Sequence, residues 1–265
     1  MKYKIDDVTY SYDIAGEGEA VLLLHGFTGT KATWKALKEK LVPQFQVITI
    51  DLPGHGESSN TPVTMEQCVE HLSQFFRQIN VERAHIIGYS MGGRVALSFA
   101  MNFSRQVKSL ILESSSPGLE MEAERKARKE SDKQLAEKIV HEGIESFVQY
   151  WENIPLFHTQ KSLDDNVSQS IRKERLSQDV IGLANSLRFM GTGSQPSWWK
   201  SLGECGVSTL LIVGELDKKF VELNRQMKAL MPKAQMEVVK DCGHAVHIER
   251  PGKFQQIVQA FLARN

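Results

Sequence analysis

The segment that most constrains the fold of this chain is a serine placed between glycines, GYSMG at 88–92. It directly follows an apolar run at 84–87 and directly precedes a helical pattern at 95–100. A strand, G-x-S-x-G and a helix in this order are typical of a nucleophile elbow, a strained turn that exposes the serine hydroxyl. The glycines let the strand and the helix pass closely, and the helix N-terminus favours a developing anion. We therefore predict that Ser90 is a catalytic serine.

Candidates for the other two members of a catalytic triad follow in the order serine, acid, histidine. The apolar run 207–213 precedes Glu215 and Asp217, and a late loop carries His244. In open α/β sheets the active site lies at the carboxyl ends of the strands, where these residues are expected. We favour Asp217 as the acid, with Glu215 as the alternative. We favour His244 over His247, which we assign to the first turn of the last helix in a capping or packing role.

The composition and charge of the chain disfavour several classes of function. Lysine and arginine number 32, as do aspartate and glutamate, and there is no basic tail, so we expect no nucleic-acid partner. The start of the chain lacks a signal-peptide pattern and the apolar runs are of strand length, so we expect no membrane association. The 3 scattered cysteines favour a cytoplasmic location. The 8 histidines lack metal-ligand spacing, so we predict no metal and no cofactor.

The order of expected elements predicts an α/β fold in which a mostly parallel central sheet is flanked by helices. Apolar, strand-like runs alternate with helical patterns at 33–41 and 65–79, and such alternation implies right-handed crossovers. The first two runs alternate in polarity, which favours an antiparallel ribbon at the edge. The strand-like runs are 3–5, 8–12, 20–24, 46–50, 84–87, 110–112 and 207–213.

The composition changes after Pro117. Charged helical patterns fill roughly 120–200 without a convincing strand, and the strand rhythm resumes only at 207. The simplest explanation is a helical cap inserted between strands of the sheet, covering the catalytic face. We therefore predict a core of residues 1–118 and 201–265, with a helical cap at 119–200.

Two further features narrow the expected chemistry. Phe27 follows the run 20–24, where its backbone N–H can complete an oxyanion hole with the amide of Met91; the alternative is a plain turn. Arg94 lies four residues after Ser90, so the two side chains share a helix face. A guanidinium beside a catalytic serine suits a substrate carboxylate. The alternative is an arginine paired with a structural acid under the cap.

Longer motifs extend over essentially the whole chain, including the cap. They are GYSMGGR at 88–94, ESSSPGL at 113–119, RKESD at 128–132, WENIPLF at 151–157, RLSQ at 175–178 and GTGSQPSWW at 191–199. In these motifs the chain resembles the 2-succinyl-6-hydroxy-2,4-cyclohexadiene-1-carboxylate synthase family of the α/β-hydrolase superfamily. The resemblance implies an α/β-hydrolase fold and a triad of Ser90, Asp217 and His244. It also implies a substrate-binding set, namely Tyr89, Arg94, Arg128, Trp151 and Arg175.

The resemblance implies a lyase of menaquinone biosynthesis. Its substrate would be 2-succinyl-5-enolpyruvyl-6-hydroxy-3-cyclohexene-1-carboxylate, a small polycarboxylate. Removal of the proton α to the succinyl ketone would give an enolate, and an enolpyruvyl group taken to lie β to that ketone would leave as pyruvate. No oligomeric state is predicted.

Two alternatives remain at this point. One is a serine esterase or carbon–carbon bond hydrolase of the same fold, and the other is a non-catalytic binding protein. A triad does not separate lyase from hydrolase, since fold does not dictate function. The set of arginines favours the lyase.

Overall fold

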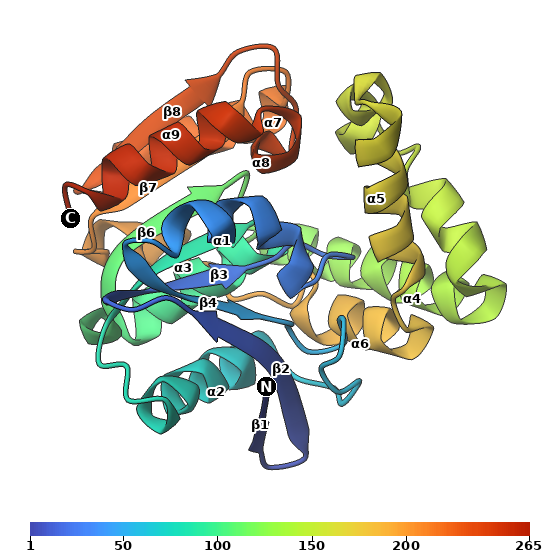
Figure 1. The fold of residues 1–265 in the computed structure, drawn as a ribbon. Coiled ribbons are helices and arrows are strands. Elements are labelled where there is room, and N and C mark those ends of the chain that lie inside the picture. Colours follow the sequence, from blue (N-terminus) through green and yellow to red (C-terminus); the bar gives the residue numbers. More distant parts are fainter.

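The computed structural model describes residues 1–265 and contains one eight-stranded sheet (Figure 1). The strands are β1 (Lys2–Ile5), β2 (Val8–Ala15), β3 (Glu19–Leu24), β4 (Phe45–Ile50), β5 (Ala84–Tyr89), β6 (Val107–Glu113), β7 (Thr209–Gly214) and β8 (Ala234–Val239). Their order in the sheet is β1-β2-β4-β3-β5-β6-β7-β8. The β1–β2 and β2–β4 pairs are antiparallel, and every other pair is parallel. The predicted mostly parallel sheet with an antiparallel edge ribbon is confirmed.

Helices cover both faces of the sheet. One face packs against α1 (Lys35–Leu41), α8 (Val246–Glu249) and α9 (Pro251–Leu262), and the other against α2 (Met65–Gln78), α3 (Met91–Asn102) and α7 (Lys218–Leu230). Strand β3 shows why two cores form, because successive side chains of a strand point to opposite faces. Leu22 and Leu24 belong to the core on the α3 side, whereas Val21 and Leu23 belong to the core on the α9 side.

The last strand, β8, is not apparent from the apolar pattern of the sequence. It pairs only with β7 and stands at the edge of the sheet, so several of its side chains are exposed. An edge strand of this kind lacks the continuous apolar run that identifies a buried parallel strand. The position of β8 at the edge of the sheet is therefore the physical reason that the sequence pattern does not reveal it.

The chain between β6 and β7 contains helices and no strand. They are α4 (Glu122–Trp151), α5 (Asp165–Leu176) and α6 (Val180–Met190), with short 3-10 turns at Pro155–Ser162 and Trp199–Glu204. Figure 1 shows α4, α5 and α6 gathered on one side of the molecule, apart from β8 and α9. They have a small core of their own, formed where α4 packs on α6. The division into a core and a cap at 119–200 stays a prediction. None of the helices combines the length and apolar character that crossing a membrane requires.

The turn between β5 and α3 has the strained geometry expected of a nucleophile elbow. Ser90 has φ 50° and ψ −107°, in a region that side chains rarely adopt. The turn requires glycines because the chain approaches itself closely there. A Cβ atom on Gly92 would lie 2.1 Å from the carbonyl oxygen of Leu24, and one on Gly88 would lie 2.3 Å from the carbonyl oxygen of Gly92.

Gly92→Ala is therefore expected to lower the free energy of unfolding by about 2–3 kcal/mol, because the added methyl group meets backbone that cannot move independently of the sheet. Chemical denaturation measures the change. Gly203→Ala is the matched control, since a Cβ atom there comes no closer than 3.9 Å to another residue. Equal stability of the two variants would show that the elbow is not closely packed.

Candidate active site

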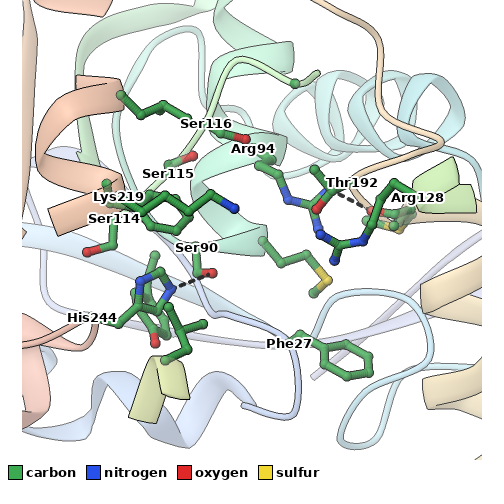
Figure 2. Close-up of a pocket in the computed structure, with 18 of the residues that line it drawn as sticks. Phe27, Ser90, Arg94, Ser114, Ser115, Ser116, Arg128, Thr192, Lys219 and His244 are labelled. Carbon is green, nitrogen blue, oxygen red and sulfur yellow. Dashed lines mark hydrogen bonds between the residues drawn. The ribbon is translucent and has the colours of Figure 1, made fainter. Parts of the chain in front are cut away.

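Three side chains from separate loops meet at the carboxyl ends of the strands. Ser90 stands between β5 and α3, Asp217 is the N-cap of α7 after β7, and His244 lies in the loop between β8 and α8. The Nδ1 atom of His244 is 2.6 Å from Oδ2 of Asp217, and its Nε2 atom is 3.1 Å from Oγ of Ser90 (Figure 2). Both His244 and Asp217 are buried. This arrangement allows the imidazole to accept the serine proton while the carboxylate holds the Nδ1–H.

The alternative acid and the alternative histidine lie elsewhere. Glu215 accepts a hydrogen bond from the backbone N–H of Asp241 at 3.3 Å and does not contact His244. His247 is bound through its ring Nδ1 and its backbone N–H to the Glu113 carboxylate, both at 2.9 Å. Its assignment to the first turn of the last helix is wrong, because it belongs to the separate one-turn helix α8. The chain turns again at Arg250 before the last helix begins.

Phe27 and Met91 line the same cavity as Ser90, and each has a backbone N–H group without an acceptor in the protein. Met91 is the first residue of α3, so its N–H has no acceptor within the helix. The N–H of Phe27 has no acceptor in the protein. The buried ring of His25 holds this turn: its Nε2 accepts the N–H of Leu52 at 2.9 Å and its Nδ1 donates to the carbonyl oxygen of Gly26 at 2.8 Å. Burial lowers the pKa of His25, which keeps the ring neutral as this pattern requires.

A cavity of about 330 Å³ lies over Ser90 and His244. Its charged lining residues are Arg94, Arg128 and Lys219, and its lining contains no aspartate or glutamate. A cavity with three cations and no acid favours an anionic ligand. The larger apolar side chains of the wall are Phe27, Met91, Leu119, Trp151, Leu156, Phe157, Leu187, Met190, Phe220 and Leu223.

Arg94 is buried at the wall of this cavity with no carboxylate in ion-pair contact, although the charge of Asp132 acts on it from farther away. Its Nη1 atom donates to the carbonyl oxygen of Met190 at 2.7 Å and approaches Oε1 of Gln195 at 3.4 Å. It forms no ion pair with a protein carboxylate, contrary to the structural alternative considered above. Burial lowers the pKa of Arg94 to about 10, and the charge of Arg128 acts in the same direction. The side chain is still protonated at neutral pH and offers its remaining N–H groups to a ligand.

The structure brings Arg128, Trp151 and Tyr89 to the same cavity. Arg128 pairs through Nε with Oδ1 of Asp132 at 2.7 Å, and Figure 2 shows its guanidinium beside that of Arg94. The indole N–H of Trp151 is buried and has no hydrogen-bond partner. The ring of Tyr89 packs against His244, with centroids 5.5 Å apart. A buried, unpartnered donor is costly, so a ligand acceptor would stabilise Trp151.

Arg175 is not among the residues that line this cavity. It borders a neighbouring pocket of about 280 Å³, and Phe157 lies in the walls of both. The Arg175 guanidinium is 4.9 Å from the centre of the Phe157 ring and donates to Oε1 of Gln160 at 3.1 Å. Its Nη1 atom is 3.9 Å from the Glu152 carboxylate. Arg175 therefore lies outside the cavity that Arg94 and Arg128 line, and the residues between its pocket and that cavity include Phe27, Tyr89 and Phe157.

The cavity is also lined by Lys219, Ser114, Ser115 and Ser116, to which the sequence pattern gives no role. The serines lie in one of the motifs quoted above, but the sequence does not show that they face the catalytic serine. Lys219 follows the acid Asp217 by two residues on α7. That position is the one signal from which the lysine could have been inferred.

Neither the histidines nor the cysteines form a second reactive centre. No group of three or more histidine, cysteine, aspartate or glutamate residues is arranged to hold a metal ion. Cys68, Cys205 and Cys242 are free and buried. Burial raises the pKa of Cys68 and Cys242 to about 12, so these thiols stay protonated and weakly nucleophilic.

Comparisons with known proteins agree on the family. A family model described as alpha/beta hydrolase fold matches residues 19–251. A Bacillus subtilis (strain 168) protein, provisionally named 2-succinyl-6-hydroxy-2,4-cyclohexadiene-1-carboxylate synthase, is 45% identical over 95% of this chain and 94% of its own. The Enterobacter sp. (strain 638) protein of that name is 29% identical over 87% of this chain and 86% of its own. MenH from S. aureus superimposes with a TM-score of 0.92 at 36% identity, and the match covers 96% of this chain and 98% of that one. A malate-bound esterase from Thermogutta terrifontis gives a TM-score of 0.88 at 28% identity, and the match covers 97% of this chain and 94% of that one.

Proposed function

Because the chain belongs to the 2-succinyl-6-hydroxy-2,4-cyclohexadiene-1-carboxylate synthases of the α/β-hydrolase fold family, we propose that Ser90, His244 and Asp217 carry out the elimination of pyruvate that forms this product. The enzyme is a carbon–oxygen lyase of menaquinone biosynthesis. The observation that carries the proposal is the cavity above Ser90, which contains three cations and no carboxylate. A substrate with several carboxylates matches that lining, whereas a neutral ester gains nothing from it.

The chemistry follows from the substrate and the product. The ring double bond at position 3 of the substrate becomes the 2,4-diene of the product, so the proton leaves C2, the carbon α to the succinyl ketone. The enolpyruvyl oxygen leaves C5, across the ring double bond. This corrects the expectation that the leaving group lies β to the ketone, because the locants place it one double bond further away. The reaction is a 1,4-elimination through a dienolate and consumes no water.

The triad supplies the base for this step. His244 Nε2 accepts the proton of Ser90 Oγ, and the serine oxygen then takes the C2 proton. The electrons of the C2–H bond pass to the ketone oxygen, which the N–H groups of Phe27 and Met91 hold as an oxyanion. When the carbonyl re-forms, the double bonds move to C2–C3 and C4–C5 and the C5–O bond breaks. The departing enolpyruvate receives the proton that His244 took from Ser90, which restores the neutral imidazole, and tautomerises to pyruvate, while Asp217 orients the imidazole throughout.

The remaining assignments are parts of the same proposal. Arg94, Arg128, Tyr89 and Trp151 bind the substrate at the cavity wall, where their placement supports the role. Arg175 lies outside this cavity, so it reaches a substrate carboxylate only if a wall residue such as Phe157, which packs on its guanidinium, moves. We also infer a cytoplasmic location, which the three free thiols support.

The purified protein is expected to release pyruvate from the enolpyruvyl substrate without forming an acyl-enzyme. In ¹⁸O-labelled water the cyclohexadiene product should contain no solvent oxygen, and intact mass spectrometry during turnover should show no adduct on Ser90. Deuterium at C2 should slow the reaction if proton removal limits the rate. The similarity to an esterase makes hydrolysis the competing function. A trapped acyl group on Ser90, or obligatory solvent oxygen in the ring product, would establish hydrolysis instead.

A further inference from the structure

Lys219 places an ammonium group in the cavity that no protein group neutralises. The residue is in the first turn of α7, two positions after Asp217, and lines the cavity above Ser90. Figure 2 shows its side chain directed into that space. Lys219 takes part in none of the ion pairs or side-chain hydrogen bonds of the protein. Its charge is therefore available to a ligand.

This lysine occupies a position that is unfavourable for the helix. The first turn of α7 contains Lys218 and Lys219 and no acidic residue. Free backbone N–H groups give a helix N-terminus a partial positive charge, so cations there destabilise the helix. Lys218 bears the same electrostatic cost but does not line the cavity. Lys218 and Lys219 thus place the same unfavourable charge at the helix N-terminus, but only Lys219 can reach a ligand in the cavity.

The surroundings of Lys219 form a second polar end of the cavity. Ser114 and Ser115 line it, and both hydroxyl oxygens are buried without a hydrogen-bond partner. Asn224 of α7 donates to the carbonyl oxygen of Ser115 at 3.1 Å, which fixes this turn against the helix that carries Lys219. Figure 2 shows Lys219 and the serines on one side of Ser90, with Arg94 and Arg128 on the other.

We propose that Lys219 is a specificity-determining residue that binds a second substrate carboxylate, at the end of the cavity opposite Arg94 and Arg128. The inference rests on the proposed function. The substrate has carboxylates on its ring, its succinyl arm and its enolpyruvyl group, and these cannot all meet one pair of adjacent arginines. Two cationic ends with the serine between them hold such a molecule across the base. The arrangement discriminates against monocarboxylates, which reach only one end.

Lys219→Gln should raise KM for the enolpyruvyl substrate about 3- to 10-fold, a modest effect because the side chain is exposed to water. The value of kcat should stay within about 2-fold, and Lys219→Arg should restore much of the affinity. The matched control, Lys218→Gln, should leave KM unchanged. Both glutamine variants should unfold at the same or a slightly higher temperature, by about 1–3 °C, since each removes a cation from the helix N-terminus.

Equilibrium binding tests the same inference without turnover. The probe is 2-succinylbenzoate, a stable aromatic analogue of the ring product with a ring carboxylate and a succinyl carboxylate. Lys219→Gln should weaken the binding of 2-succinylbenzoate. Two monoacids, 2-butanoylbenzoate and 4-oxo-4-phenylbutanoate, each keep one of its two carboxylates, and Lys219→Gln should leave the binding of one of them unchanged. The insensitive monoacid lacks the carboxylate that Lys219 binds.

The outcomes separate the two proposals. Equal effects of Lys218→Gln and Lys219→Gln, or no effect of Lys219→Gln on both KM and probe affinity, would overturn the role of Lys219. A wild-type protein that releases no pyruvate would overturn the proposed function. In that case the probe titration alone decides whether Lys219 binds a carboxylate.

Discussion

Asp217→Asn is expected to lower kcat for pyruvate elimination by about 10⁴-fold, as the loss of the orienting carboxylate does in other triads. Oδ2 of Asp217 accepts the Nδ1–H of His244 at 2.6 Å, and an asparagine amide can present a donor there instead. The imidazole would then carry its proton on Nε2, which faces Ser90 Oγ, and could no longer accept the serine proton. Ser90→Ala and His244→Ala should lose at least as much activity. A variant that combines these substitutions should lose little more activity than the single variants, because the three groups act as one unit.

Steady-state kinetics of pyruvate release, together with thermal unfolding, tests this prediction. Each variant should stay folded, since none of the substitutions enlarges a side chain. Glu215→Gln is the control, because that carboxylate contacts the N–H of Asp241 and not the triad. Near-normal turnover in Asp217→Asn together with an inactive Glu215→Gln would move the acid to Glu215.

The parts of the site that could be predicted from sequence depend on local geometry. The elbow is encoded by Gly88, Ser90 and Gly92 within one turn, and the strain at Ser90 follows from the close approach of strand and helix. The acid and the histidine could be selected because parallel strands deliver their carboxyl ends to one edge. Asp217 and Glu215 both follow the run 207–213, and His244 could be placed only in a late loop, because the strand before it, β8, is not apparent from the apolar pattern.

The parts that could not be predicted depend on packing between distant segments. Lys219 faces the cavity because α7 packs against the turn after β6 through Asn224, a contact between residues more than a hundred positions apart. Phe157 packs on Arg175 and lies in the walls of two pockets, and the place of that ring depends on how the helices between β6 and β7 pack together. The helical spacing of apolar residues predicts that these helices exist. It does not determine which side chain lies in the wall shared by two pockets.

Arg94→Met is expected to lower kcat/KM by about 10²- to 10³-fold while leaving the protein as stable as the wild type or more so. The kinetic loss follows because a buried carboxylate would lose its charged, forked partner, which typically costs a few kcal/mol. Stability should not fall in parallel, because Arg94 is buried without a direct ion pair. Replacing a buried charge by an apolar side chain of similar volume is often neutral or stabilising. Cavity water can then satisfy the carbonyl oxygen of Met190 and Oε1 of Gln195, the two acceptors that the arginine leaves behind.

The combination of lost activity and retained stability distinguishes a substrate-binding arginine from a structural one. Arg94→Lys keeps the charge but lacks the fork, so it should restore little of kcat/KM. Arg128→Ala should cost less than Arg94→Met, since Arg128 is half-exposed and already paired with Asp132. Arg175→Ala should cost least in kcat/KM if the Phe157 ring stays in place during turnover. An Arg94→Met variant that melts early yet keeps its kcat/KM would show that the guanidinium supports the fold around Met190, and the carboxylate would then have to bind elsewhere in the cavity.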